Sequence, residues 1–596
     1  MKKLLATIAI MSAILAPLSA GQETSTPPLS DNYEKIYPID DQIIQDLRDL
    51  YILNGLALPS TTGPYSGSEL LMALERLDYA VLDDFSRGLY DSIRSQLDAD
   101  GAASTFTADI TIFPQFYLHT NTDEAFQTWE KWAFEWADTV PVLSFVTEEH
   151  IGRNFYGFFD FSLGTTKTKA PYGESAFGDR FWESNIPIDI MNNLDFNFPY
   201  RAFVAAGGEN WSLEVGRERY SWGPGQTGNF ILGDHIKYHN SARITTFDDN
   251  FKYTFLVLSF IHPQNYYYSG ELHPNGQNGQ SSYLNGISAF IAHRLEWRLF
   301  SDKVGLVLTE GVMYMSKDNR IDLIALSPAH LFHNSYTRSL TNSILSFEFD
   351  WTIVKGLNLY AQLVVDEMIL PGEPVPGKKG DSLAEPTSMG YMLGLSYETA
   401  VADGILALNL EGVYTDPYLY LRDADRQIDG NSGRNQNPGD WGINFVVPTR
   451  EMVKTGGTQY FDEQFLGYRY GGDAIVGQLS ASYRKPGEWE LGTRVFYMAH
   501  GTHDQWTVWT RVNGNYHNVT TPTDEHQTGN HKDANAGQRN AVSHIFDLGF
   551  DMKLLLPYGF SIESSLDFVS VLNAGNIKSD KLLFDIQWTI GLGWSL

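Results

Sequence analysis

The feature that most constrains the fold is an alternation of apolar and polar residues with a period of two, running from about Phe106 to the C-terminus. Successive side chains of a β-strand point to opposite faces, so each alternating segment is expected to be a strand with one apolar face. Clear examples lie at 345–352, 406–411, 546–553 and 560–568. A soluble sandwich alternates in the same way, but about sixteen to eighteen such segments favour a membrane-spanning barrel.

The connections between these segments are alternately short and long. Short turns are expected at 354–356 and 485–487, and long polar loops at about 415–473 and 500–541. Outer-membrane barrels have short turns on the periplasmic side and long loops outside the cell. The pattern therefore predicts an all-β transmembrane barrel of about sixteen to eighteen antiparallel strands, covering residues 104–596.

The C-terminus and the composition agree with a barrel. Trp588, Ile590, Leu592, Trp594 and Leu596 share one face of a final strand, which is expected to pair with the first strand. Aromatic residues make up 14% of the chain and 53 residues are glycine, although the mean hydropathy is only −0.25. Strands and aromatic girdles let a barrel cross a membrane without a long apolar helix, and no second apolar stretch of that length is present.

The N-terminus predicts export from the cytoplasm. Lys2 and Lys3 precede an apolar run at 4–15, and small residues before Gly21 suit cleavage, so residues 1–20 are expected to be a signal peptide. Residues 21–30 are expected to form a disordered leader. The chain has no cysteine, which excludes a lipid-modified cysteine anchor, disulfides and thiolate metal sites.

Residues 31–100 predict a small helical domain ahead of the barrel. Apolar residues at helical spacing predict helices near 43–51, 70–77 and 81–97, with Gly55 ending the first of them. The domain has too little apolar surface to be robust alone, so we expect it to pack on another part of the protein, on the periplasmic side.

The formal net charge of −30 excludes a nucleic-acid partner, because no basic stripe is present to displace the counterions of phosphates. Acidic groups could bind cations, or face lipopolysaccharide through bridging divalent ions. The simpler explanation is that they solvate the long loops. Outer-membrane lipids and lipopolysaccharide are the expected surroundings.

The stretch Val215–Asp234 reads VGRERYSWGPGQTGNFILGD. Its Gly-Arg followed by Trp-Gly-Pro-Gly resembles the signature of the Wzi family of capsule-assembly outer-membrane proteins. The helical start at 38–98 also resembles the family, as do later segments in the same order: 292–298, 308–312, 359–367, 414–418 and 465–468. The resemblance implies a monomeric barrel of about eighteen strands with a helical bundle at the periplasmic mouth and a lumen narrowed by loops. The role that it implies is lectin-like attachment of capsular polysaccharide to the cell surface.

The first candidate site is the Trp-Gly-Pro-Gly stretch. Tyr220 and Trp222 could stack on sugar rings, and Arg217 and Arg219 could bind carboxylated saccharides. Alternatively, the glycines and proline make a tight reversal into the lumen, and the arginines neutralise inward carboxylates. We favour the structural alternative.

The second candidate site lies on two adjacent strands. Arg294, Glu296 and Arg298 share one face of a strand, and Glu310 lies on the following strand. Facing inward, they would form an ion network that grips a polar ligand or simply fills the lumen. The filling role is the favoured hypothesis.

The third candidate site is the long loop at 416–472. Aromatic rings beside carboxylates and amides are what carbohydrate binding needs, because sugars offer an apolar CH face and a rim of hydroxyls. Folding over the barrel mouth explains the same composition equally well. The ligand candidates here are Tyr418, Tyr420, Arg422, Trp441, Tyr468 and Tyr470.

Other motifs give weaker signals. Acidic residues at 423–429 lack the glycine and the final glutamate of a calcium-binding EF-hand loop. The histidines near 500–544 are irregularly spaced for a metal, and Gly-Asp-Ser-Leu at 380–383 lacks the domain that a GDSL esterase needs. The histidines are His500, His503, His517, His526, His531 and His544. We therefore predict no metal, no cofactor and no enzymatic activity.

Two functions remain in view. The first is non-catalytic binding and assembly of a surface or capsular polysaccharide by an outer-membrane monomer. The alternative is a porin for small solutes or sugars, which shares the fold and differs in having an open lumen.

Overall fold

The structure is a computed structural model, and it describes residues 34–101, 106–121, 139–165, 182–187, 194–260, 287–316, 321–327, 340–368, 387–421, 444–454, 458–505, 507, 511–512, 515–516, 519–525 and 538–596. The expected signal peptide and leader lie outside these residues.

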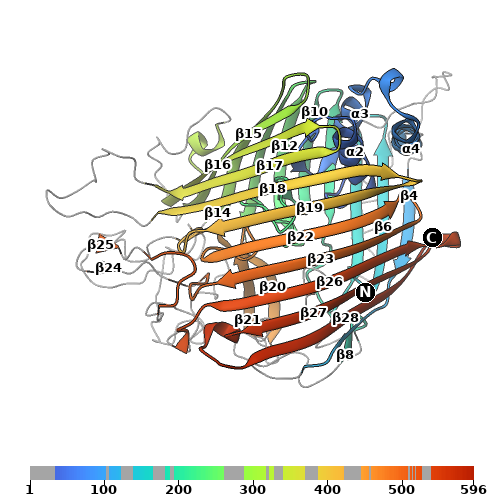
Figure 1. Cartoon of the computed structure of the whole chain (residues 1–596). Helices are drawn as coiled ribbons and strands as arrows, with labels where there is room; N and C mark the ends of the chain where they lie inside the picture. The colour runs from blue at the N-terminus through green and yellow to red at the C-terminus, as the bar shows by residue number, and fades with distance from the viewer. Residues whose placement is uncertain are drawn as a thin grey trace.

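Antiparallel strands close into one barrel (Figure 1). β5 continues β4, and β8 pairs with β5 where β6 pairs with β4, so the barrel has 18 strand positions. The prediction of an all-β barrel is therefore confirmed. Its strands are β4 (Phe106–Ile112), β5 (Gln115–His119), β6 (Leu143–Ile151), β7 (Phe155–Leu163), β8 (Trp182–Ser184), β9 (Ala202–Gly208), β10 (Trp211–Glu218), β12 (His239–Phe247), β13 (Phe251–Phe260), β14 (Ile287–Leu299), β15 (Val304–Ser316), β16 (Leu340–Val354), β17 (Leu357–Glu367), β18 (Ser388–Val401), β19 (Gly404–Thr415), β22 (Ala474–Lys485), β23 (Trp489–His500), β26 (Ser543–Leu555), β27 (Phe560–Leu572) and β28 (Leu582–Ser595).

The last strand closes the barrel by pairing with the first. In β28, Trp594 lies opposite Ile112 of β4, and Trp588 lies opposite Leu118 of β5. The predicted pairing of the C-terminal strand is confirmed, and each of the two terminal strands covers an edge of the other.

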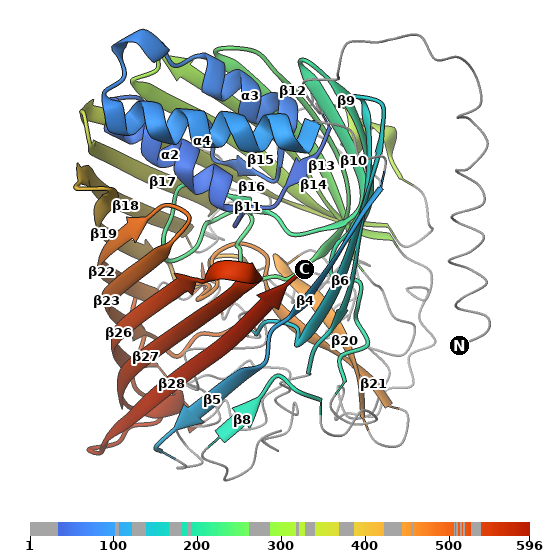
Figure 2. The ribbon, with the colours of Figure 1, turned by 90° about the vertical axis from the view of Figure 1, so that its right-hand side faces the viewer.

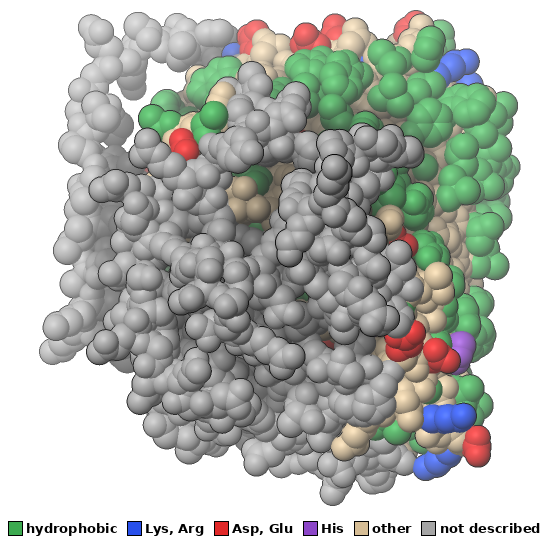
Figure 3. All heavy atoms as spheres, turned by 90° about the vertical axis from the view of Figure 1, so that its left-hand side faces the viewer, with side chains coloured by type: hydrophobic (Ala, Val, Ile, Leu, Met, Phe, Trp, Pro, Cys, Tyr) green, Lys and Arg blue, Asp and Glu red, His purple; other side chains and the backbone are tan. Residues whose placement is uncertain are grey.

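The two faces of the strands differ in polarity as the alternation predicts. In β16, Phe347 and Trp351 are exposed on the outside, whereas Glu348 and Asp350 are buried inside. Hydrophobic side chains gather on the part of the outer wall that Figure 3 shows. An exposed apolar surface of this extent suits contact with lipid. Further exposed apolar residues are Leu393, Leu410, Leu479 and Leu592.

The two ends of the barrel are different. The short turns predicted at 354–356 and 485–487 join β16 to β17 and β22 to β23, and we call this end the short-turn end. The other end carries the long connections and is called the long-loop end. Four two-stranded sheets accompany the barrel: β1 (Ile36–Tyr37) with β3 (Tyr65–Ser66), β2 (Thr62–Gly63) with β11 (Ser221–Trp222), β20 (Val446–Lys454) with β21 (Thr458–Phe465), and β24 (Arg511–Val512) with β25 (Asn515–Tyr516).

Three helices lie across part of the short-turn end, beside β12 to β19 (Figure 2). They are α2 (Gln42–Leu53), α3 (Gly67–Glu75) and α4 (Asp84–Gly101), so the three predicted helices are present. The side chains of Asp41 and Ser66 cap α2 and α3 by accepting backbone N–H groups. None of the helices in the described ranges has the length and apolarity that crossing a membrane requires. Their shared core includes Leu47, Leu50, Leu74, Ile93 and Ile405 of β19, so the helices pack on the barrel.

Candidate functional site: the barrel interior

The chain between α2 and α3 enters the barrel, and we call residues 56–66 the plug segment. Its strand β2 pairs with β11 inside the barrel. The backbone N–H of Leu58 donates to Asp350 Oδ1 at 2.8 Å, and the N–H of Gly223 donates to the Thr61 carbonyl at 2.8 Å. The plug segment is therefore bound to both the wall and an inner segment of the barrel.

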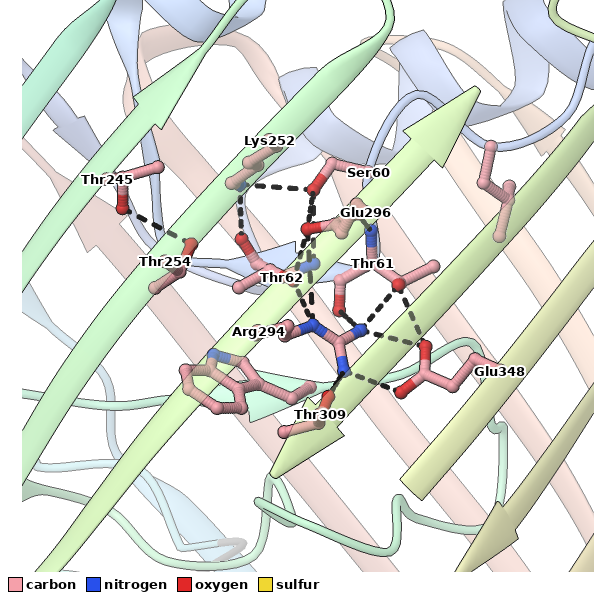
Figure 4. A network of polar contacts seen from close by, with 12 residues as sticks. Ser60, Thr61, Thr62, Thr245, Lys252, Thr254, Arg294, Glu296, Thr309 and Glu348 are labelled. Carbon is pink, nitrogen blue, oxygen red and sulfur yellow. Dashed lines mark hydrogen bonds and ion pairs between the residues drawn. The ribbon is translucent and has the colours of Figure 1, made fainter. Parts of the chain in front are cut away.

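Buried charges on the wall surround the plug segment (Figure 4). Arg294 of β14 donates to both carboxylate oxygens of Glu348 on β16, at 2.7 and 2.8 Å. Glu296 accepts hydrogen bonds from Ser60 Oγ and from Thr61 N, at 3.1 and 3.2 Å. Because these charges are removed from water, their stability depends on one another and on the polar atoms of the plug segment.

Two more basic side chains hold the plug segment by its carbonyl groups. Lys252 Nζ donates to the Thr62 carbonyl at 2.9 Å and also contacts Glu69 of α3. Arg298 Nε donates to the Leu58 carbonyl at 2.6 Å. Charged residues of β13, β14 and β16 thus surround the plug segment, which is more than 180 positions away in the sequence. We call Lys252, Arg294, Glu296, Arg298 and Glu348 the charged cradle.

Glu310 was predicted to lie on the inner face with Arg294, Glu296 and Arg298, and for Glu310 this prediction is wrong. Arg294 lies opposite Thr309 on β15, whereas Glu310 lies opposite His293. Since neighbouring residues of a strand point to opposite faces, Glu310 is on the outer face of the sheet. The other three residues do share the inner face and contact the plug segment.

Three further arginines attach the N-terminal region to the barrel, each across a long separation in sequence. These contacts place the helices at a fixed position in the barrel mouth. The pairs are Arg76 with Asp302, Arg484 with Asp46 and Asp49, and Arg243 with Glu214 and the Pro64 carbonyl.

Burial changes the acidity of two carboxyl groups in this region. It raises the pKa of Glu34 to about 8, although the hydrogen bond from Ser212 and the charge of Arg243 act to lower it. Burial also raises the pKa of Asp49 to about 6, against the lowering effect of Arg484. Both residues lie where the N-terminal region meets the barrel.

The raised pKa of Glu34 predicts that the docking of residues 34–37 depends on pH. The folded protein holds this proton more tightly than the unfolded chain does, so the stabilisation is complete below a pH of about 4.5 and is lost as the pH rises to about 8. We expect hydrogen exchange of residues 34–37, corrected for the intrinsic rate, to accelerate between pH 6 and pH 8.5. Glu34→Gln should remove that dependence, and Glu75→Gln on exposed α3 should keep it. Equal protection at both pH values would contradict the prediction.

The Trp-Gly-Pro-Gly stretch lies inside the barrel. The Trp222 ring is fully buried, with the Arg294 guanidinium 5.5 Å from its centroid. The buried Tyr220 hydroxyl donates to Glu214 Oε1 at 3.2 Å and lies 2.8 Å from Ser241 Oγ. Their rings contact protein in this structure, and the geometry agrees with a tight reversal of the chain into the lumen.

Arg217 and Arg219 mainly hold backbone carbonyls. Arg217 Nη1 donates to the carbonyls of Asn197 and Pro199, at 2.7 and 3.0 Å. Arg219 Nε donates to the Asp234 carbonyl at 2.8 Å, and Arg219 Nη1 lies 3.1 Å from Asp40 Oδ2. These arginines were expected to neutralise inward carboxylates. Among the ion pairs described for the two of them, the only carboxylate is Asp40, which pairs with Arg219.

The loop tyrosines pack into the same interior. Tyr420 donates to the Phe230 carbonyl at 2.7 Å and accepts from the N–H of Tyr468 at 2.9 Å. Tyr418 packs edge-on against His503. These three tyrosines are buried, and Tyr470 is partly exposed. Arg422 and Trp441 lie outside the described residues, so the loop keeps its candidate sugar-binding role as a prediction.

An apolar core joins the inner segment, the loop and the wall. It packs residues near Phe230 and Tyr468 against inward side chains of the strands. Members of this core include Trp222, Phe230, Leu232, Leu258, Phe290, Met313, Tyr360, Val413, Leu421, Phe445, Leu466 and Tyr468. The inner segment and the loop are therefore packed against one side of the barrel interior.

Several residues of the interior were not singled out by the sequence analysis. Glu348 and Asp350 formed part of the polar face predicted at 345–352, and Lys252 had no distinguishing signal. Glu411 accepts hydrogen bonds from the N–H groups of Gln226 and Thr227, both at 2.8 Å. Its place on the polar face of the alternating segment at 406–411, beside Asn409, was the one available hint.

The histidines of the 500–544 segment that the structure describes do not gather into a metal site. His500 bonds to the carbonyls of Gly501 and Tyr470, and His503 bonds to Thr523. Among the residues that the structure describes, no group of three possible metal ligands is found. His517, His526, His531, the acidic residues at 423–429 and the Gly-Asp-Ser-Leu string lie outside those residues.

Part of the inner wall, on β23, β26 and β27, is charged and partly exposed. Arg494 of β23 forms ion pairs with Asp547, Asp551 and Asp567. The Arg494 side chain is 25% exposed and that of Asp551 is 46% exposed. One side of the interior is thus packed with apolar side chains, and another carries partly exposed charges.

A closed antiparallel barrel with an apolar outer surface and a charged interior defines a large β-barrel of the outer-membrane kind. No protein-family profile matches the chain, and no curated protein sequence matches it. Among solved structures it is similar to Wzi from Escherichia coli, described as an outer-membrane protein involved in group 1 capsule assembly and a carbohydrate-binding β-barrel. The two share 13% sequence identity with a TM-score of 0.53, over 94% of this chain and 98% of that chain. This likeness shows a shared fold.

Two channels align more loosely. The DcaP channel of Acinetobacter baumannii has a TM-score of 0.33 and 7% identity, covering 82% of this chain and 97% of the other. OprD of Pseudomonas aeruginosa has a TM-score of 0.36 and 7% identity, covering 82% and 95%. Alignments at this level carry no argument about this chain.

Proposed function

We propose that this chain is an outer-membrane protein that binds a surface polysaccharide and takes part in its assembly, without catalysing a reaction. The observation that carries the proposal is the packing inside the barrel, because the plug segment and the apolar core occupy space that a general pore would leave open. The shared fold with a barrel described as carbohydrate-binding supports the same proposal. The chain would act as a monomer anchored by its lipid-facing wall.

The proposed glycan contacts are on the long-loop end. The partly exposed Tyr470 and the loop residue Trp441 are the aromatic residues that we expect to stack on sugar rings. The buried Tyr418, Tyr420 and Tyr468 would support the loop from below, together with Arg217, Arg219, Tyr220 and Trp222. Arg422 would contribute a hydrogen-bonding fork for an acidic sugar.

The test is binding of purified protein to surface polysaccharides of the source cell, displayed on an array. We expect Trp441→Ala and Tyr470→Ala each to weaken binding about tenfold, since an aromatic contact with a sugar is worth about 1 kcal/mol or somewhat more. Tyr558→Ala is the matched control, because Tyr558 is 90% exposed at the short-turn end. Binding that is absent in the wild type, or equal in all three variants, would contradict the proposal.

A second candidate function is a selective channel, and one observation favours it. The polar wall around Arg494 and Asp551 is partly exposed to solvent on the inside of the barrel. Such a wall could line a narrow path for small polar solutes beside the packed apolar side chains. Conductance across a planar bilayer separates this function from polysaccharide binding by a closed barrel.

A further inference from the structure

A short segment between β15 and β16 lies on the outside of the barrel, and we call residues 321–327 the strap. It contains the short 3-10 helix η2 (Leu323–Leu326), whose Ala325 is buried in an apolar cluster with wall residues of β14 and β15. On β14, Ala289 and Ile291 belong to this cluster, whereas Phe290 between them belongs to the core inside the barrel. Since successive side chains of a strand point to opposite faces, the strap is folded back against the outer wall. The buried members of the cluster are Ala289, Ile291, Val312, Tyr314 and Ala325.

The strap meets the wall a short way in from the long-loop end. β14 begins at Ile287, so Ala289 and Ile291 lie two and four positions inside that end. At about 3.3 Å per residue along a strand, these positions are about 7 and 13 Å from the end. Further in, the same outer face carries exposed apolar side chains such as Leu306 and Phe347, as expected of a surface that faces lipid. The strap therefore lies at the border of the lipid-facing wall.

The side of the strap that faces away from the wall is apolar. Leu323 is 78% exposed, Ile321 is 44% exposed and Ile324 is 38% exposed. Single exposed apolar residues are common on proteins in water, but three within four positions form a patch that continues the apolar wall. Asp322 is the one charged residue of the strap, and its side chain accepts the N–H of Ile324 at 3.3 Å.

The backbone of the strap is largely hydrogen-bonded within the protein. The N–H of Asp322 donates to the Tyr314 hydroxyl at 2.9 Å. The N–H of Ala325 donates to the Asp322 carbonyl at 3.0 Å, and the N–H of Ser327 donates to the Ile324 carbonyl at 3.1 Å. A backbone group without a partner is costly in a bilayer, and irregular backbone exposed to lipid is excluded from the hydrocarbon core. A segment with these bonds and an apolar outer side suits the boundary between headgroups and acyl chains.

We propose that the strap is a membrane-contact element, whose apolar side chains insert between acyl chains of the outer leaflet at the headgroup boundary. Lipid is the partner that continuity favours, because the patch of Ile321, Leu323 and Ile324 joins the wall that already faces lipid. The contact goes beyond polysaccharide binding and does not depend on it. It gives the barrel an extra lipid anchor at the end where we expect the polymer to bind.

The experiment uses a fluorescent label at one introduced cysteine, which is specific because the chain has no cysteine of its own. The full mature protein is placed in phospholipid nanodiscs with one copy per disc, so that water reaches both ends of the barrel. Leu323→Cys carries a nitrobenzoxadiazole label on the strap. Leu393→Cys, on the exposed outer face of β18, is the lipid-facing control, and Asp84→Cys, exposed on α4, is the water-facing control. Because Leu323 is exposed, its replacement should leave the fold intact.

Two quenchers report the surroundings of each label. Iodide reaches labels in water, whereas a lipid with a nitroxide near the headgroup end of its acyl chain reaches labels at the boundary. We expect the nitroxide lipid to quench the Leu323→Cys label about as strongly as the Leu393→Cys label. We expect iodide to quench the Leu323→Cys label about fivefold less than the Asp84→Cys label, since the strap side chain is withdrawn from water.

Two results would overturn the inference. Iodide quenching equal to that of the Asp84→Cys label, without quenching by the nitroxide lipid, would place the strap in water. Protection of the Leu323→Cys label from both quenchers would show that protein covers the patch. Neither result involves polysaccharide binding, which the array measures separately.

Discussion

Replacing Arg294 with methionine is expected to destabilise the folded protein by about 3–5 kcal/mol, the largest effect of any single substitution considered. Arg294 is fully buried and donates to both oxygens of Glu348, to Thr309 and to Thr61. Its removal leaves the buried carboxylate of Glu348 without its main partner, which costs far more than the net worth of the pair. Guanidinium unfolding of the protein in micelles, followed by tryptophan fluorescence, measures the loss.

Two variants make this result specific. Arg494→Met removes an arginine that is 25% exposed, and one of its carboxylate partners, Asp551, is 46% exposed, so it should cost less. Arg294→Met combined with Glu348→Met should recover much of the lost stability, because neither charge then remains buried alone. If Arg294→Met and Arg494→Met cost the same, the cradle around the plug segment would not be the main attachment.

The second large effect is expected from Gly223→Ala, within the Trp-Gly-Pro-Gly stretch. The φ angle of Gly223 is 138°, and a Cβ there would come within 2.0 Å of Gln362 Nε2 and 2.2 Å of Asn229 Oδ1. Backbone strain and overpacking together should cost about 2–4 kcal/mol, measured by the same unfolding experiment.

Gly88→Ala is the matched control for this substitution. Gly88 lies within α4, and a Cβ added there meets nothing within 4 Å. Alanine favours a helix over glycine, so the control should be neutral or stabilising by up to about 1 kcal/mol. A Gly223→Ala protein as stable as the wild type would show that the stretch does not need its observed conformation.

The barrel could be predicted because the alternation of apolar and polar residues that defines each strand lies in consecutive residues. Each strand shows its two faces in consecutive residues, as 345–352 does, and the final strand carries its own closing signal at 588–596. The helices were predictable for the same reason, since residues 43–51 repeat apolar side chains at helical spacing.

The plug segment could not be predicted from the sequence. Its residues, LALPSTTGPYS from Leu56 to Ser66, have no period and resemble an ordinary linker rich in turn residues. The side chains that hold it, such as Lys252 and Glu348, lie almost 200 or more positions away. Only the closed barrel brings them together, because inward-facing side chains on different strands converge on a common interior.

The candidate aromatic residues were harder to interpret for a different reason. Loops rich in Gly, Asp and Asn contain two kinds of tyrosine. In one kind the hydroxyl is hydrogen-bonded inside the protein, and in the other the ring stacks on a sugar. Tyr420 and Tyr468 are of the first kind in this structure, bonded to each other through backbone and hydroxyl. Burial distinguishes the two kinds, and burial depends on which segments the barrel encloses.

The central claim is that the plug segment and the apolar core block the lumen of the barrel. Single-channel recording in a planar lipid bilayer tests it most directly, with the wild-type protein and Arg294→Met inserted under the same conditions. We expect the wild type to give a silent bilayer and Arg294→Met to give intermittent openings as the plug segment is released. Steady ohmic conductance by the wild type would contradict the claim.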